Sequence, residues 1–93
     1  MITKMHFRKI SDAGHGWLEV PLSTFNQFGG QASGYSYYCP TRKTVYLEED
    51  SDMGKFLDML SADFYEIENV YLDKDGDHCF VRELPRFAPE HIS

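Results

Sequence analysis

The acidic side chains of residues 48–77 are the residues of this 93-residue chain whose types and spacing offer the clearest chemistry. The segment holds eleven Asp or Glu and two Lys, a net charge of −9, whereas residues 1–47 carry +3 and residues 78–93 are neutral. Spaced carboxylates can imitate a phosphate backbone and attract Lys and Arg, while repelling nucleic acid itself. A simpler interpretation is a solvated polar face that keeps an acidic protein soluble.

Three tyrosines offer a second kind of chemistry, contact through exposed aromatic rings. On a strand, Tyr35 and Tyr37 would share one face and Tyr38 would lie on the other. Exposed tyrosines are favoured at protein interfaces and can also stack on single-stranded bases. Arg42 and Lys43 follow in the next turn and would add a small basic patch. The alternative is that these tyrosines are core residues with their hydroxyls at the rim.

The patterns for metal binding and catalysis are poor. Residues 73–77 (DKDGD) resemble the start of a calcium loop, but His78 and Leu84 occupy the positions that need Gly and Glu. An acidic hairpin turn explains the same residues. Cys39 and Cys79 form no CxxC pair, and the four histidines are scattered. We therefore expect no metal, no cofactor, no catalytic residue and no enzyme, and two reduced thiols.

The local patterns predict one α+β domain over residues 1–93, with a mostly antiparallel sheet and two short helices. Gly29 and Gly30 are expected to end the first helix, Asp50 or Ser51 to cap the second, and Phe87 to pack on the core. No apolar run approaches the length of a membrane span. The predicted order is β-β-α-β-β-α-β-β, with strands near residues 5–10, 17–20, 35–39, 44–48, 65–72 and 79–81 and helices near residues 22–28 and 50–60.

Five stretches carry a family resemblance: GHGWLEVP (14–21), SGYSY (33–37), VYLEEDSD (45–52), FL (56–57) and FVRELPRF (80–87). The chain resembles a family of small proteins encoded by bacterial phages, prophages and plasmids. That family has no assigned activity, so the resemblance supplies no catalytic residue. It implies a setting in which small acidic proteins inhibit host defence, including anti-CRISPR and anti-restriction proteins.

These observations lead to one functional hypothesis and one alternative; a third hypothesis, a small enzyme or a calcium-stabilised domain, lacks the motifs it needs. The protein is expected to act in the cytoplasm of a bacterial host cell, as a monomer or homodimer, by binding the basic channel of a CRISPR effector or restriction enzyme. Reversal of four of its acids (residues 48, 49, 50 and 52) to lysine should then abolish binding without unfolding the protein. The alternative is a small nucleic-acid-binding module that uses the three tyrosines with Arg42 and Lys43. The residues predicted to bind the partner are Glu48, Glu49, Asp50, Asp52, Asp58, Tyr35, Tyr37 and Tyr38.

Overall fold

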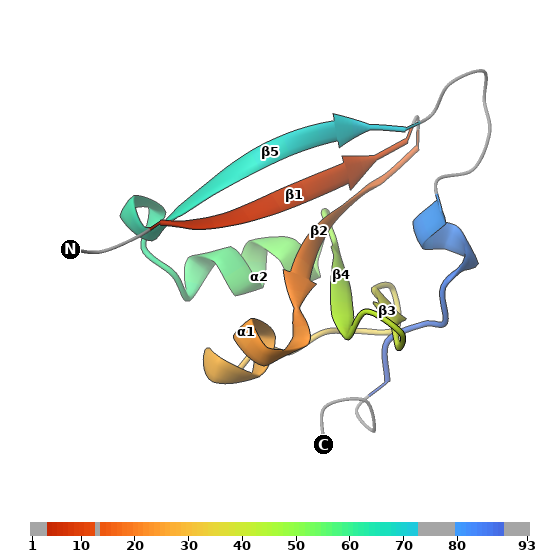
Figure 1. Ribbon diagram of the computed structural model, residues 1–93, viewed down its shortest axis with the longest axis horizontal. Helices are drawn as coiled ribbons and strands as arrows, with labels where there is room; N and C mark the ends of the chain where they lie inside the picture. Colours follow the sequence, from red (N-terminus) through yellow and green to blue (C-terminus); the bar gives the residue numbers. More distant parts are fainter. Residues whose placement is uncertain (1–3, 13, 73–79, 89–93) are drawn as a thin grey trace.

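The computed structural model describes residues 4–12, 14–72 and 80–88, which form a five-stranded sheet with two short helices (Figure 1). The outer strands β1 and β5 follow residues whose apolar side chains partly alternate, the central strands β2 and β4 follow consecutive apolar residues, and the helices follow apolar residues spaced by three and four positions. In chain order the elements are β1 (Met5–Ser11), β2 (Gly16–Pro21), α1 (Leu22–Gln27), β3 (Tyr37–Cys39), β4 (Thr44–Glu48), α2 (Asp52–Asp58), the 3₁₀ helix η1 (Ala62–Phe64), β5 (Tyr65–Tyr71) and the 3₁₀ helix η2 (Phe80–Glu83).

The strand order in the sheet is β3-β4-β2-β1-β5. Three of the four pairings are antiparallel, whereas β5 runs parallel to β1 along its whole length, from Met5 opposite Tyr65 to Ser11 opposite Tyr71. A parallel pair needs a crossover connection. Here the chain between β1 and β5 contributes the rest of the sheet and both α-helices before it returns.

One face of the sheet packs against both helices. Phe25 of α1 and Phe56 of α2 are fully buried and stack with ring centroids 5.9 Å apart. Gly29, at φ +68°, takes the left-handed conformation that ends α1, as the sequence predicted. Phe87 reaches this core from the C-terminal segment and meets Phe25 edge to face at 5.6 Å. The core cluster consists of Phe7, Leu18, Val20, Phe25, Tyr38, Val45, Leu47, Phe56, Leu60 and Phe87.

The opposite face is covered in part by η2. Val81 is fully buried, and Phe80 packs edge to face on Tyr46 at 5.7 Å. This second cluster consists of Ile10, Trp17, Tyr37, Cys39, Tyr46 and Val81. Strands β2, β3 and β4 are therefore buried on both faces, which explains why they carry large side chains at consecutive positions, whereas β5 has no buried residue.

The α+β class, the single compact domain and the mostly antiparallel sheet are confirmed. The prediction of a final strand is wrong for Phe80 and Val81, which begin a 3₁₀ helix instead. Arg86 makes only an isolated bridge with Tyr37. Apolar content alone cannot separate a strand from a helical turn that covers a sheet. Cys79 and the predicted turn at residues 73–77 lie outside the described residues.

None of the described helices combines the length and the apolar character that a membrane crossing requires.

Candidate functional site

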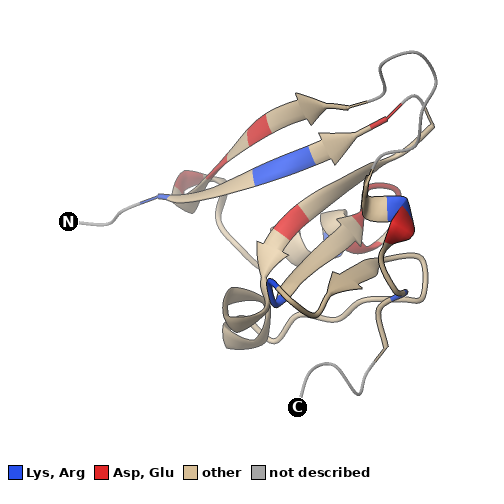
Figure 2. Cartoon of the chain, turned by 45° about the vertical axis from the view of Figure 1, so that its right-hand side comes forward, with Lys and Arg blue, Asp and Glu red and all other residues tan. Residues whose placement is uncertain are grey.

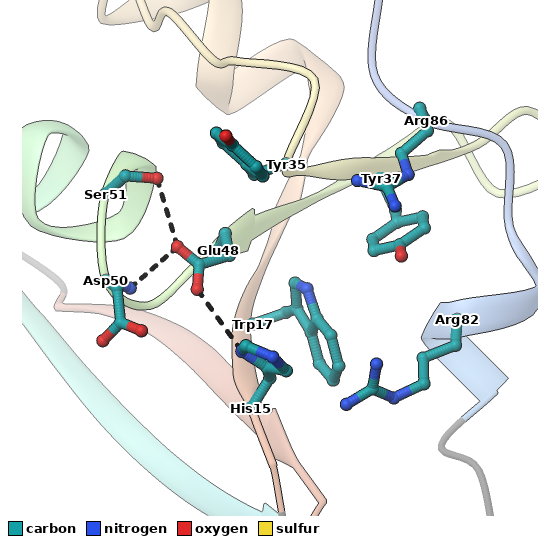
Figure 3. Close-up of a pocket in the computed structure, with 9 residues that line it drawn as sticks. All are labelled: His15, Trp17, Tyr35, Tyr37, Glu48, Asp50, Ser51, Arg82 and Arg86. Atoms are coloured by element: carbon teal, nitrogen blue, oxygen red, sulfur yellow. Dashed lines mark hydrogen bonds and ion pairs between the residues drawn. The ribbon is translucent and has the colours of Figure 1, made fainter.

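A pocket of about 450 Å³ opens where the turn between β1 and β2, the end of β4 and the C-terminal segment meet (Figure 3). Its volume is in the range of small-molecule sites, and it also suits a single side chain of a partner. Aromatic, basic and acidic groups line different parts of it. The lining residues are His15, Trp17, Tyr35, Tyr37, Glu48, Asp50, Ser51, Arg82 and Arg86.

The aromatic wall consists of Trp17, Tyr37 and Tyr35. Trp17 and Tyr37 meet edge to face, with centroids 6.0 Å apart, and both are buried. Tyr35 precedes β3 and is 68% exposed, so its ring stands at the rim. The indole Nε1 of Trp17 is buried and has no hydrogen-bond partner among the described residues. Because an unpartnered buried N–H is costly, this atom invites an acceptor from the pocket.

Two arginines form the basic side of the pocket, and both make hydrogen bonds within the protein. Arg82 donates to both carboxylate oxygens of Asp12 (2.6 and 3.1 Å) and lies over the Trp17 ring at 5.2 Å. Arg86 lies over the Tyr37 ring at 5.0 Å and donates to the carbonyl of Gly34. These cation–π contacts fix the rings that form the aromatic wall.

The carboxylate of Asp12 anchors the turn that carries His15. It accepts hydrogen bonds from the backbone N–H groups of Gly14 and His15, each at 2.9 Å. The hydrogen bonds from Arg82, together with those two backbone bonds, outweigh burial and hold the pKa of Asp12 far below its usual value. Asp12 is therefore charged in the native protein and joins this turn to η2.

Glu48, His15 and Asp50 form the acidic side. One oxygen of Glu48 accepts from the backbone N–H of Asp50 (2.9 Å) and the hydroxyl of Ser51 (3.1 Å). Its other oxygen lies 3.7 Å from His15 Nδ1. One ligand atom from each of His15, Glu48 and Asp50 lies within 4.8 Å of the others, which is a set that could hold a metal ion. Asp50 is exposed and forms no ion pair with a described residue.

Beneath the pocket, Asp52 fixes the loop that carries Tyr35. Its carboxylate is only 2% exposed and accepts from Ser33 N (2.8 Å), Ser33 Oγ (2.7 Å) and Ser36 Oγ. Ser36 Oγ in turn accepts from the backbone N–H of Glu48 at 3.0 Å. This buried network ties the start of α2, the Tyr35 loop and the end of β4 into one rigid support.

Only part of the predicted partner surface is accessible. Tyr35, Asp50 and Asp58 are exposed. Glu49 is half-buried and pairs with Lys9 at 2.8 Å, and Glu48 is mostly buried. Ser51 occupies the N-cap of α2, as predicted, but its hydroxyl serves Glu48 instead of a helix N–H group.

Three predicted contact residues are corrected by the structure. Asp52 is buried because it turns inward from the first turn of α2 to the two serines. Tyr37 and Tyr38 are buried because the short strand β3 is covered on both faces, with Tyr38 in the helix-side core and Tyr37 in the opposite cluster. The expectation that residue 52 could be reversed to lysine without unfolding the protein conflicts with this burial.

One residue of the predicted basic patch, Arg42, is engaged within the fold, although both Arg42 and Lys43 are exposed. Arg42 donates to Tyr46 Oη (3.0 Å) and Cys39 Sγ (3.4 Å), and Tyr46 donates to Glu19 (2.8 Å). Burial raises the pKa of Cys39, but the bonds with Thr41 and Arg42 outweigh it and lower this pKa to about 7. The thiol itself is buried, so this network is structural.

Sequence reasoning missed His15, Trp17, Arg82 and Arg86. Successive side chains of a strand point to opposite faces, so the sequence of β2 could have placed Trp17 on the other face of the sheet from Leu18. The two arginines carried no local signal, because the contacts that bring them to the pocket span more than 50 residues of chain.

No protein-family model matches the sequence, no curated protein is significantly similar to it, and no solved structure significantly resembles the fold.

Proposed function

We propose that this chain is a non-enzymatic phage or mobile-element protein that inhibits a bacterial defence complex, in the manner of an anti-CRISPR protein, by occupying a basic nucleic-acid channel. One observation carries the proposal. Asp50 is exposed and forms no ion pair with a described residue, and it stands beside Glu48 at a pocket whose rim holds the exposed ring of Tyr35. A channel that binds phosphates presents Lys and Arg, and this site offers such a side chain both charge and an aromatic face.

The contact would be focused on the pocket instead of being spread over the whole acidic segment. Figure 2 shows Asp and Glu distributed over several elements of the chain. Some of them are neutralised locally, since Glu49 pairs with Lys9, and Glu66 lies near Lys4 and His6. A partner side chain would enter between Tyr35 and the carboxylates, where the fixed oxygens of Glu48 cost little to organise.

The alternative of direct nucleic-acid binding has less support. Tyr37 and Tyr38 are buried, and Arg42 is engaged by Tyr46 and Cys39. Of the residues in that hypothesis, Tyr35, Arg42 and Lys43 are exposed. Base stacking normally combines several rings with a basic groove, and one exposed ring with two neighbouring basic residues, one of them engaged within the fold, is a weak platform.

A pair of charge reversals separates a specific contact from general acidity. Asp50→Lys at the pocket and Asp63→Lys on η1 change the net charge equally, and both side chains are exposed. Wild type and both variants would be used to capture proteins from bacterial lysate at low and high salt. Capture of a CRISPR effector or restriction enzyme that weakens in high salt and is lost only in Asp50→Lys supports the proposal. Equal loss of capture in both variants would mean that nonspecific charge, and not the pocket, holds the complex.

Direct titration with single-stranded oligonucleotides tests the alternative. The proposal predicts no saturable binding by the wild type. Saturable binding that is lost in Tyr35→Ala would favour the nucleic-acid module instead.

A further inference from the structure

We propose that His15, Glu48 and Asp50 form a binding site for a divalent transition-metal ion, with Zn²⁺ as the best match. Imidazole nitrogen combined with carboxylate oxygen suits Zn²⁺ and its neighbours better than Ca²⁺ or Mg²⁺, which prefer sets made only of oxygen. Two carboxylates and a neutral imidazole also balance the charge of a divalent ion. This site does not depend on the proposed function.

The distances fit a metal better than a direct contact. His15 Nδ1 and Glu48 Oε1 are 3.7 Å apart, which is too long for a hydrogen bond. Two ligands of a tetrahedral zinc ion stand about 3.4 Å apart, given bond lengths near 2.1 Å. All three ligand atoms already lie within 4.8 Å of one another. His15 and Asp50 are exposed, so small side-chain rotations can close the set.

The protein holds the central ligand in the required orientation. Asp50 N and Ser51 Oγ occupy one oxygen of Glu48, which leaves the other directed toward His15 (Figure 3). The backbone N–H of Glu49 donates to the carbonyl of Gly16 at 3.0 Å, which holds the end of β4 beside the turn that carries His15. Such support of a ligand by its neighbours is typical of metal sites.

An independent feature of the pocket also points to a bound ligand. Trp17 is 2% exposed, yet its indole Nε1 has no acceptor among the described residues. In Figure 3 this nitrogen lies on the side of the ring that faces Tyr35 and Tyr37. Three protein ligands leave a zinc ion an open position for water or an oxygen ligand. An oxygen ligand held in this part of the pocket would supply the acceptor that the indole lacks.

The only tryptophan of the chain makes the site measurable. The His15 and Trp17 rings are 6.1 Å apart between centroids, so Ni²⁺ bound here should quench the tryptophan fluorescence. Untagged protein would be titrated with Ni²⁺, and Zn²⁺ would be tested by the rise in melting temperature that preferential binding to the native state produces. Zn²⁺ should also compete with Ni²⁺ and restore the fluorescence.

Matched variants make the test decisive. His15→Gln and Asp50→Asn should each weaken Ni²⁺ binding by at least about tenfold, since even an outer-shell partner contributes that much. His6→Gln is the control, because His6 also faces a carboxylate (Glu66, 3.4 Å) but has a lysine near that carboxylate instead of a third ligand. In EDTA all three variants should have the same melting temperature as the wild type. An unquenched wild type, or equal binding by His15→Gln and the wild type, overturns the site.

The metal and a basic partner would share Asp50 and Glu48. Partner capture should therefore be measured both in EDTA and with Zn²⁺, and competition between them would appear as weaker capture in Zn²⁺.

Discussion

Replacement of Asp52 by alanine should destabilise the protein strongly, although sequence reasoning placed this residue on a solvent-exposed acidic surface. The buried carboxylate accepts three hydrogen bonds, from Ser33 N, Ser33 Oγ and Ser36 Oγ. A hydrogen bond to a charged group contributes about 1.5–3 kcal/mol, and the three are not additive because they share one acceptor. Ser36 is completely buried, so its hydroxyl cannot turn to water. We expect a loss of about 3 kcal/mol in the free energy of unfolding, or about 12–24 °C in Tm for a domain of this size.

The assay is urea denaturation with a control from the same helix. Asp58→Ala removes an exposed carboxylate from α2 and should change the free energy of unfolding by less than about 0.5 kcal/mol. Ser36→Ala in both backgrounds completes a double-mutant cycle, which should show coupling between Ser36 and Asp52. If Asp52→Ala were as stable as Asp58→Ala, the buried network and the rigid Tyr35 loop derived from it would be refuted.

Three further predictions address the rest of the fold. Because the pKa of Asp12 is depressed in the native state, its stabilising contribution is present above about pH 4 and is lost as the pH falls. Asp12→Asn should therefore reduce the dependence of the free energy of unfolding on acid pH, measured by urea denaturation from about pH 7 to pH 2. Arg42→Ala should raise the pKa of Cys39 above about 7, measured by thiolate absorbance against pH with the second cysteine replaced by serine; an unchanged pKa would contradict the role of this arginine. Phe87→Ala should cost about 3–5 kcal/mol in urea denaturation, and a near-neutral effect would show that the C-terminal segment does not complete the core.

Local patterns predicted those elements that local contacts determine. Alternation identified β1, Pro21 marked the end of β2, and the turn at residues 40–43 identified β4 as the returning strand of a hairpin. Gly29 marked the end of α1 because the left-handed conformation there favours glycine. The parallel pairing of β5 with β1 was not predicted, since it depends on a crossover that encloses most of the chain. The 3₁₀ turn at Phe80 was missed because its apolar residues suit a strand equally well.

The candidate site was predicted in part for a similar reason. Tyr35 and Asp50 are exposed, as a contact surface requires, but the inward direction of Asp52 depends on serines 16 and 19 positions earlier in the chain. An acidic residue in the first turn of a helix already has a sufficient local explanation in the helix dipole, so its sequence position gives no sign of burial. The histidine and arginines of the pocket come together only through tertiary contacts.

The central claim is that the pocket around Tyr35 and Asp50 binds a basic defence complex, and the most direct test is comparative capture with the two charge reversals. Wild type, Asp50→Lys and Asp63→Lys would be immobilised at equal density in EDTA, exposed to the same bacterial lysate and washed in low or high salt. We expect wild type and Asp63→Lys to retain the same CRISPR or restriction complex at low salt, and Asp50→Lys to retain none. Retention of the same complex by all three proteins would contradict the claim, as would an absence of any nucleic-acid-handling complex from the wild type.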